Sequence, residues 1–180
     1  VELANSHPQS MEKLIARMTA KQIDSLSKGN NLLTSHSQAP RFVNVLTVKE
    51  LRELSNNYSR TFDLILANIG EDVVTRLIKD SGTDFTPHFV MSLSFDQLKI
   101  MHGHNSQNFK KAFSYFNIIQ IANFIERSDL LTADKDAKAK VSLLTLGQLQ
   151  ELNAINSKLF DAIIANLTSK QLEGIVRSNS

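Results

Sequence analysis

A single arrangement of apolar and polar positions occurs three times in this chain of 180 residues. Each occurrence begins with a Leu followed by Ser or Thr, has Glu or Gln three residues after that hydroxyl, and then has apolar residues at intervals of three and four. A Phe follows 16 positions after the opening Leu, as in Leu46 with Phe62, Leu93 with Phe109, and Leu144 with Phe160. Self-similarity of this kind predicts a tandem-repeat protein, in which each unit packs on its neighbour.

The Ser/Thr-x-x-Glu/Gln element predicts where helices begin. In such a capping box the hydroxyl accepts a hydrogen bond from the backbone N–H three residues later, and the Glu or Gln accepts one from the N–H of the capping residue. Apolar residues spaced by three and four after the box, such as Leu51 and Leu54, form one buried stripe of a short helix. We expect boxes at Thr19, Thr47, Ser94, Thr145 and Thr168, with a related cap at Asn117.

Each unit is expected to contain three helices. A polar pair before the Phe favours the end of the first helix and the start of the second, because Asn and Ser compete for backbone hydrogen bonds. These pairs are Tyr58-Ser59, Asn105-Ser106 and Asn156-Ser157, and the third helices are expected to begin at Gly70, Asn117 and Thr168. The sequence thus predicts an all-α fold, an α-solenoid-like array of three-helix units with a period of about 47–51 residues.

We interpret the chain as one helical repeat domain over residues 1–180, with units at 46–81, 93–128 and 144–178. The linkers between the units are 29–45, 82–92 and 129–143. Pro40 and Pro87 interrupt the first two linkers, and residues 134–140, which alternate charge and Ala, favour an added helical turn in the third. Residues 41–45 also suit an extended conformation, although a lone strand has no sheet to join.

Residues 11–28 match the closing part of a further unit, whose opening Leu would fall before Val1. This indicates a piece of a longer protein with its first unit bisected. A cut unit exposes apolar surface, here expected near Leu14, Ile15 and Met18. The pattern therefore predicts self-association through residues 11–28.

The amino-acid composition excludes several classes of protein. Apolar residues make up 42% of the chain, and no stretch approaches the roughly 18 apolar residues of a membrane span, so we expect no transmembrane segment. Cysteine is absent, which excludes disulfides, thiolate metal sites and a cysteine nucleophile. The six glycines are scattered, and no phosphate loop or catalytic motif of known spacing occurs. We expect no enzyme activity, no cofactor and no metal.

Candidate binding residues lie in and just before the middle unit. His102 and His104 are two positions apart, so on a helix they face different sides, and we interpret them as solvated rather than as ligands of one metal. Lys110 and Lys111 follow them and form a basic corner. This corner is either a solvated helix face or an anion site.

Seven of the ten phenylalanines also lie in this region. Either they fill a bulky core, because the middle of a stack is buried on both sides, or some of them line a groove for an apolar anchor. Phe85 and Phe89 are the candidates for the groove, because they stand outside the repeated core positions.

The opening Leu-Thr-x-x-Gln-Leu-x-x-Leu with a variable pair after it resembles the first helix of TAL-effector-like DNA-binding repeats. In that family the variable pair meets a base, which would implicate Asn57-Tyr58, His104-Asn105 and Ile155-Asn156 here. The chain departs from the family in lacking a glycine pair, in its longer period and in its third helix. No Lys or Arg position is shared by the three units, so a repeated phosphate contact is not predicted.

We expect a non-enzymatic scaffold that binds a protein partner through its stacked surface. The candidate partner-binding residues are Phe85, Phe89, His102, His104, Asn105, Lys110 and Lys111. Two alternatives stay open: a module for nucleic acid or anionic lipid, weak because the net charge is +2, and a regulatory or substrate-binding segment of a larger enzyme. The polar, cysteine-free composition is similar to that of large effector proteins of intracellular bacteria, which implies a cytoplasmic location or delivery to a host cytosol.

Overall fold

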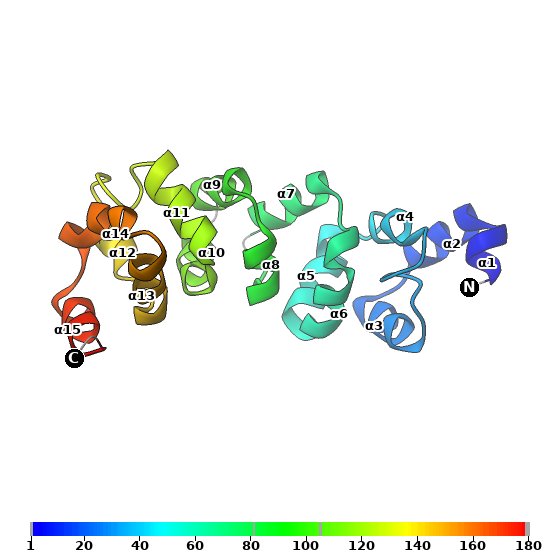
Figure 1. Ribbon diagram of the computed structural model, residues 1–180. Helices are drawn as coiled ribbons and strands as arrows, with labels where there is room; N and C mark the ends of the chain where they lie inside the picture. Colours follow the sequence, from blue (N-terminus) through cyan, green and yellow to red (C-terminus); the bar gives the residue numbers. More distant parts are fainter. Residues whose placement is uncertain (1, 81, 105, 179–180) are drawn as a thin grey trace. The chain divides into compact units, whose positions relative to one another are not determined.

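The computed structural model describes residues 2–80, 82–104 and 106–178, and all regular structure in these ranges is helical, with no strand (Figure 1). The all-α prediction is therefore confirmed. The contacts divide the chain into two compact bodies, Val1–Phe89 with Ile100–Asn108, and Val90–Lys99 with Phe109–Ser180. The expectation of one repeat domain stays a prediction.

The helices are short throughout. Up to residue 80 they are α1 (Glu2–Ser6), α2 (Pro8–Ile15), α3 (Ala20–Gly29), α4 (Ala39–Val43), α5 (Val48–Asn57), α6 (Ser59–Ile65), the 3₁₀ turn η1 (Leu66–Asn68) and α7 (Glu71–Lys79). Those that follow are α8 (Pro87–Ser92), α9 (Phe95–His104), α10 (Ser106–Ala112), η2 (Phe113–Tyr115), α11 (Ile118–Arg127), α12 (Ala137–Val141), α13 (Leu146–Ile155), α14 (Ser157–Ile163), η3 (Ile164–Asn166) and α15 (Ser169–Ser178).

Every predicted capping box forms. Reciprocal bonds between the capping side chain and the residue three positions later occur at Thr19, Thr47, Ser94, Asn117, Thr145 and Thr168. These bonds satisfy amide groups that a helix leaves free at its first turn. They fix the start of six helices, and the cap prediction is confirmed.

The predicted helix breaks also occur where the polar pairs stand. Helix α5 ends at Asn57 and α6 begins at Ser59, while α13 ends at Ile155 and α14 begins at Ser157. Asn105, in the third pair, lies outside the described residues. One feature was not predicted: each second helix tightens into a 3₁₀ turn before the third helix, at η1, η2 and η3.

Three helices lie in stretches that the sequence pattern treats as linkers. Helix α12 lies in the third linker, where a helical turn was expected over residues 134–140. The second half of the linker 82–92 forms α8, and residues 41–43 are helical in α4 rather than extended. A proline opens both helices, where its missing N–H costs nothing. The turn that follows is fixed by the carbonyls of Val43, Val90 and Val141, which accept the amides of Leu46, Leu93 and Leu144 at 3.1, 3.2 and 3.0 Å.

The boundaries of these elements recur at a fixed offset. Helices α4, α5, α6 and η1 begin and end 98 residues before α12, α13, α14 and η3, as Leu46 precedes Leu144. Side-chain bonds share the offset: the Asn68 amide donates to the carbonyls of Leu33 and Thr34, and that of Asn166 to those of Leu131 and Thr132. Such matching contacts arise when the same apolar and polar pattern is packed in the same way.

The core follows the predicted stripe. Phe62, Phe109 and Phe160 are 0%, 2% and 6% exposed, as predicted. Around Phe109 the rings of Phe113, Phe116 and Phe124 gather with centroids 4.9, 5.8 and 5.7 Å away. The concentration of phenylalanine in the middle of the sequence thus includes a buried aromatic cluster.

Helices pack against neighbours in a recurring order. Helix α3 packs on α5 and α6, and α11 packs on α13 and α14. Glutamines of the capping boxes add polar cross-links, because their amide nitrogens reach carbonyls at earlier helix ends. Gln120 bonds to Val90 and Leu93 at 2.8 and 2.9 Å, and Gln171 bonds to Val141 and Leu144 at 3.0 Å each.

Candidate functional site

The expectation that Phe89 presents an exposed ring is wrong, because its side chain is fully buried. Helix α8 turns it inward, where its ring lies 5.5 Å from that of Phe62. Phe85 is half-buried and stacks on Phe89 with ring centroids 5.0 Å apart. Both rings therefore belong to the packing of their body, and the groove hypothesis loses its exposed anchor.

The histidine pair lies in the last turn of α9. His104 is exposed and His102 is half-buried. The neighbouring candidate Asn105 lies outside the described residues. Within the described residues, no three His, Asp or Glu side chains gather in a way that could hold a metal ion.

Lys110 and Lys111 lie on α10, and both side chains are exposed. The Lys111 carbonyl accepts a hydrogen bond from the Ser114 hydroxyl at 3.1 Å, where α10 passes into η2. The sequence contains no Asp or Glu between Asp96 and Glu126, so acids of this stretch do not offset the two lysines. The chain from α9 to α11 thus carries local positive charge.

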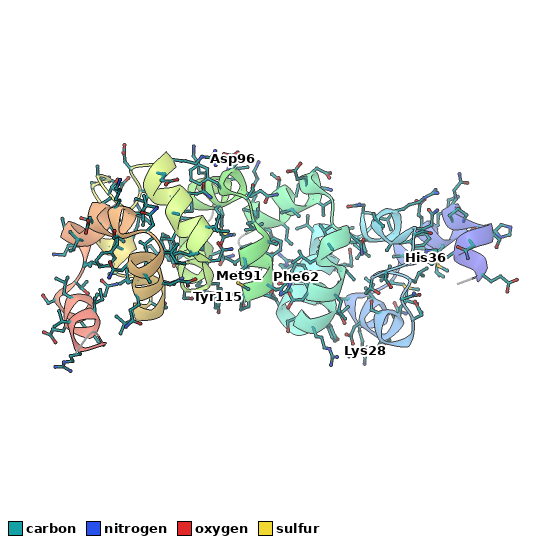
Figure 2. All side chains as sticks on the ribbon, in the orientation of Figure 1. Lys28, His36, Phe62, Met91, Asp96 and Tyr115 are labelled. Carbon is teal, nitrogen blue, oxygen red and sulfur yellow. The ribbon has the colours of Figure 1, made fainter. Side chains whose placement is uncertain are left out.

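The sequence analysis missed three exposed apolar side chains in and just before this stretch. They are Met91 at the end of α8, Tyr115 in η2 and Ile119 in α11, which are 45%, 39% and 69% exposed. The Asn117 side-chain amide donates to the Met91 carbonyl at 3.4 Å and so links the cap of α11 to the end of α8. Met91 and Tyr115 are labelled in Figure 2. We call Met91, Tyr115 and Ile119 the apolar patch.

The patch occupies positions that are polar in the other predicted units. Met91 corresponds to Asn44 and Ser142, Tyr115 to Asn68 and Asn166, and Ile119 to Asp72 and Lys170, by the same offsets that relate Leu46, Leu93 and Leu144.

At the first set of positions, the Asn44 side chain makes polar contacts that include the backbone of Asn68. The Asn44 amide donates to the carbonyls of Pro40 and Asn68 at 2.6 and 3.4 Å, and its oxygen accepts the Gly70 N–H at 2.7 Å. Corresponding positions are thus polar around Asn44 and apolar around Met91, although similar helices carry both sets. The fold therefore does not require apolar side chains at the positions of Met91, Tyr115 and Ile119.

The patch rests on a well-packed base. Tyr115 and Asn117 flank Phe116, which is 3% exposed and stacks on Phe124 with ring centroids 5.6 Å apart. Asn117 also caps α11, and the buried Gln120 amide ties that helix to the carbonyls of Val90, in the last turn of α8, and Leu93, just after it. A patch whose backbone is fixed in this way presents its side chains with little loss of freedom on binding.

Comparisons with models of known protein families, with curated proteins and with solved structures find no match for this chain. Among the helices of the described residues, none is long and apolar enough to cross a membrane. The assignment of a function therefore depends on the surface alone.

Proposed function

We propose that this chain is a non-enzymatic tandem array of three-helix units that binds an acidic segment of a protein partner through the apolar patch. The repeat interpretation is supported by the recurring boxes, by the buried Phe of each unit and by the elements that recur after 98 residues. In repeat proteins of this kind the framework is constant and partner choice lies in the exposed positions that vary between units.

One observation carries the proposal: three exposed positions in and just before the second unit are apolar, and their counterparts in and just before the first and third units are polar. Exposed apolar side chains grouped on a fixed base are the usual anchors of a protein interface. Tyr and Met are enriched at such interfaces, because they supply large contact areas. The apolar patch has both, together with Ile119.

The partner is expected to be acidic around its apolar anchors. Lys111 lies one turn before Tyr115, Lys110 precedes it, and the nearest acids in the sequence are Asp96 and Glu126. Charge of one sign beside an interface steers a partner of opposite sign and speeds association. An acidic peptide with two or three apolar residues fits both features.

The test is selection of a randomised peptide library on the 180-residue chain, followed by fluorescence anisotropy with the selected peptides. The matched control variant carries the residues of the third unit, Met91→Ser, Tyr115→Asn and Ile119→Lys. It removes the apolar anchors with residues that the corresponding framework accepts, and it adds positive charge. We expect peptides that combine acidic and apolar residues, and at least a tenfold loss of affinity in the variant, the equivalent of about 1.4 kcal/mol. Peptides that bind both proteins equally would contradict the proposal.

The same triple variant distinguishes binding of a protein partner from binding of nucleic acid or anionic lipid. Duplex DNA and vesicles containing phosphatidylserine are tested with the wild type, with the triple variant and with Lys110→Glu plus Lys111→Glu. Polyanion binding that falls steeply with salt, survives loss of the patch and disappears with the two lysines would replace the protein partner by nucleic acid or lipid. Weak binding that physiological salt removes is expected under our proposal.

A further inference from the structure

A groove lies between helices α13 and α15, in the same compact body as the apolar patch. It has a volume of about 510 Å³. Its lining includes Leu146 at the start of α13, Ser142 just before that helix, and four residues of α15: Lys170, Glu173, Gly174 and Arg177. The four α15 residues are spaced by three and four positions, so they face the same side of the helix.

Gly174 keeps the groove open. A Cβ atom at this position would lie 3.1 Å from the Leu146 side chain, so a larger residue would push Leu146 into the groove or occupy the groove itself. Leu146 is 38% exposed. The counterparts of Gly174 in α7 and α11, which stand 98 and 51 residues earlier, are Arg76 and Asn123. The third predicted unit thus differs from the other two at the residue that keeps this space free.

The side of α15 that lines the groove faces solvent on third helices inside the chain as well. On α3 the counterparts of residues 170, 174 and 177 are Lys21, Ser25 and Lys28. All three are exposed, although α5 and α6 pack on α3. On α11, Ile119 and Glu126 are likewise exposed, although α13 and α14 pack on that helix. This side of a third helix is therefore exposed even where other helices pack on it.

The first turn of α13 joins the groove to the apolar patch. The Gln148 amide, in the box that opens α13, donates to the carbonyls of Phe113 and Phe116 at 3.0 and 2.8 Å. Tyr115 of the patch lies between these two residues in the sequence, and Leu146 of the groove begins the same helix as Gln148. Helix α13 also packs on α11, which carries the third residue of the patch. The patch and the groove are therefore neighbours on one body.

The groove and the patch also occupy corresponding places in the predicted units. Met91 and Ile119 of the patch are the counterparts of Ser142 and Lys170, which line the groove. Stacked repeats form an extended binding surface, on which a partner crosses the same place of successive units. A partner held at the patch would meet the groove as it crosses from the second unit to the third.

We propose that the acidic partner of the apolar patch continues into this groove, where an apolar residue packs on Leu146 and acidic residues bind Lys170 and Arg177. This contact presupposes the proposed binding at the patch. Lys170 and Arg177 are both exposed and outnumber Glu173, so the groove attracts a segment of negative charge. A short peptide selected for the patch fills the patch alone, and the groove takes the residues next to it in the intact partner.

Extended peptides test this continuation. A peptide selected for the patch is lengthened at either end by a randomised segment of about six residues, which spans about 20 Å when it is extended. A second selection is then made on the 180-residue chain. We expect extensions that contain acidic and apolar residues and that raise the affinity at least tenfold over the parent peptide, as measured by fluorescence anisotropy.

Two groove variants assign this gain in affinity. Gly174→Asn fills the groove with the residue of α11 and leaves the charge unchanged, so it is expected to remove the gain. Lys170→Gln with Arg177→Gln should reduce both the gain and its dependence on salt. The matched control is Lys135→Gln with Lys158→Gln, which removes the same charge at exposed lysines and should leave the gain intact. Circular dichroism verifies that each variant is folded, and the parent peptide should bind them all about as tightly as it binds the wild type.

Three results would overturn the proposal. They are a second selection that yields no extension better than the parent peptide, a gain that survives both groove variants, and equal losses in the control pair, which would mean that the extension responds to overall charge. Each of these results leaves the binding at the patch in place. That binding fails separately, if the parent peptide binds the triple variant of the patch as tightly as the wild type.

Discussion

At the scale of single residues, the buried stripe and the caps contribute unequally to stability. Leu149 is fully buried and Phe160 is 6% exposed, whereas Thr145 is exposed and its hydroxyl accepts the Gln148 N–H of its own box at 3.2 Å. Leu149→Ala and Phe160→Ala are expected to cost roughly 2–5 kcal/mol, since each leaves a cavity, and Thr145→Ala about 1 kcal/mol through loss of a cap. Urea unfolding measures the three values. Equal losses would mean that the stripe does not face the core.

Asp24 makes stability depend on pH. The Lys28 ammonium and the Thr61 hydroxyl hold the pKa of the Asp24 carboxyl below its usual range, against the opposing effect of burial. Because the folded pKa lies below the unfolded value of about 3.9, the ionised carboxylate stabilises the fold above about pH 4. This stabilisation is lost as the pH falls through the folded pKa.

The comparison with Asp24→Asn isolates this effect. We expect the difference in unfolding free energy between the wild type and the variant to be constant from pH 7 to about pH 5 and to shrink below about pH 4. Thermal unfolding at a series of pH values measures it. A difference that stays constant down to pH 2 would show that the Asp24 carboxyl is not held in its ionised form.

Individual residues also show which features could be predicted from the sequence and which could not. The rings at the repeated Phe positions were predicted to be buried because they recur, but Phe89 was misjudged because it stands before the opening Leu of its unit. Its counterpart Phe42 is likewise fully buried, and Pro-x-Phe-Val precedes the opening Leu in both units. That shared motif was the available signal. The apolar patch was missed because the units were compared for what they share, whereas a binding surface lies where they differ.

At the scale of elements, the glutamines of the boxes do more than cap. The Gln120 side chain is 5% exposed, its oxygen accepts the Asn117 N–H, and its nitrogen donates to the carbonyls of Val90 and Leu93. Gln120→Glu retains the cap, as Glu50 does in the box of Thr47, but removes both donated bonds. We expect a loss of about 1–3 kcal/mol at pH 7, because two carbonyls would then face a carboxylate instead of a donor.

Gln22 supplies the matched control. It closes the box of Thr19 in the same way, but it is exposed, and its amide donates to no protein carbonyl in the described part of the chain. Gln22→Glu should therefore change the unfolding free energy by only a few tenths of a kcal/mol. Urea unfolding of the two variants compares them directly. Equal losses would assign the effect of Gln120→Glu to the cap rather than to the cross-link.

The helices that the sequence predicted and those it missed differ in what stabilises them. Helices α5, α11 and α13 have ten residues each, a box and a periodic stripe, and such signals are local. Helix α4, which the sequence did not predict, has five residues, which is too short to be stable without tertiary contacts. Helix α12 is equally short and depends on the same kind of contacts, although a helical turn was expected over residues 134–140. Their formation depends on burying residues such as Phe42 and Val141. The 3₁₀ turns also follow from packing, because they tighten the approach to the third helix.

At the scale of the whole molecule, the constant framework and the variable surface have separate roles. The framework was predictable, because every unit repeats the same local signals. The surface was not, because an exposed Met, Tyr or Ile is favourable only in relation to a partner that the sequence does not contain. The predicted repeats also provide an internal reference, since each position of the apolar patch has two counterparts elsewhere in the sequence.

The most direct measurement is therefore a titration of the isotope-labelled chain with a selected acidic peptide, followed by NMR chemical shifts of the backbone amides. The account predicts saturable shifts grouped at Met91, Tyr115 and Ile119 and their neighbours. It predicts none at the counterparts Asn44, Asn68, Asp72, Ser142, Asn166 and Lys170. Shifts of equal size at corresponding positions of all three units, or shifts only around Lys110 and Lys111, would contradict it.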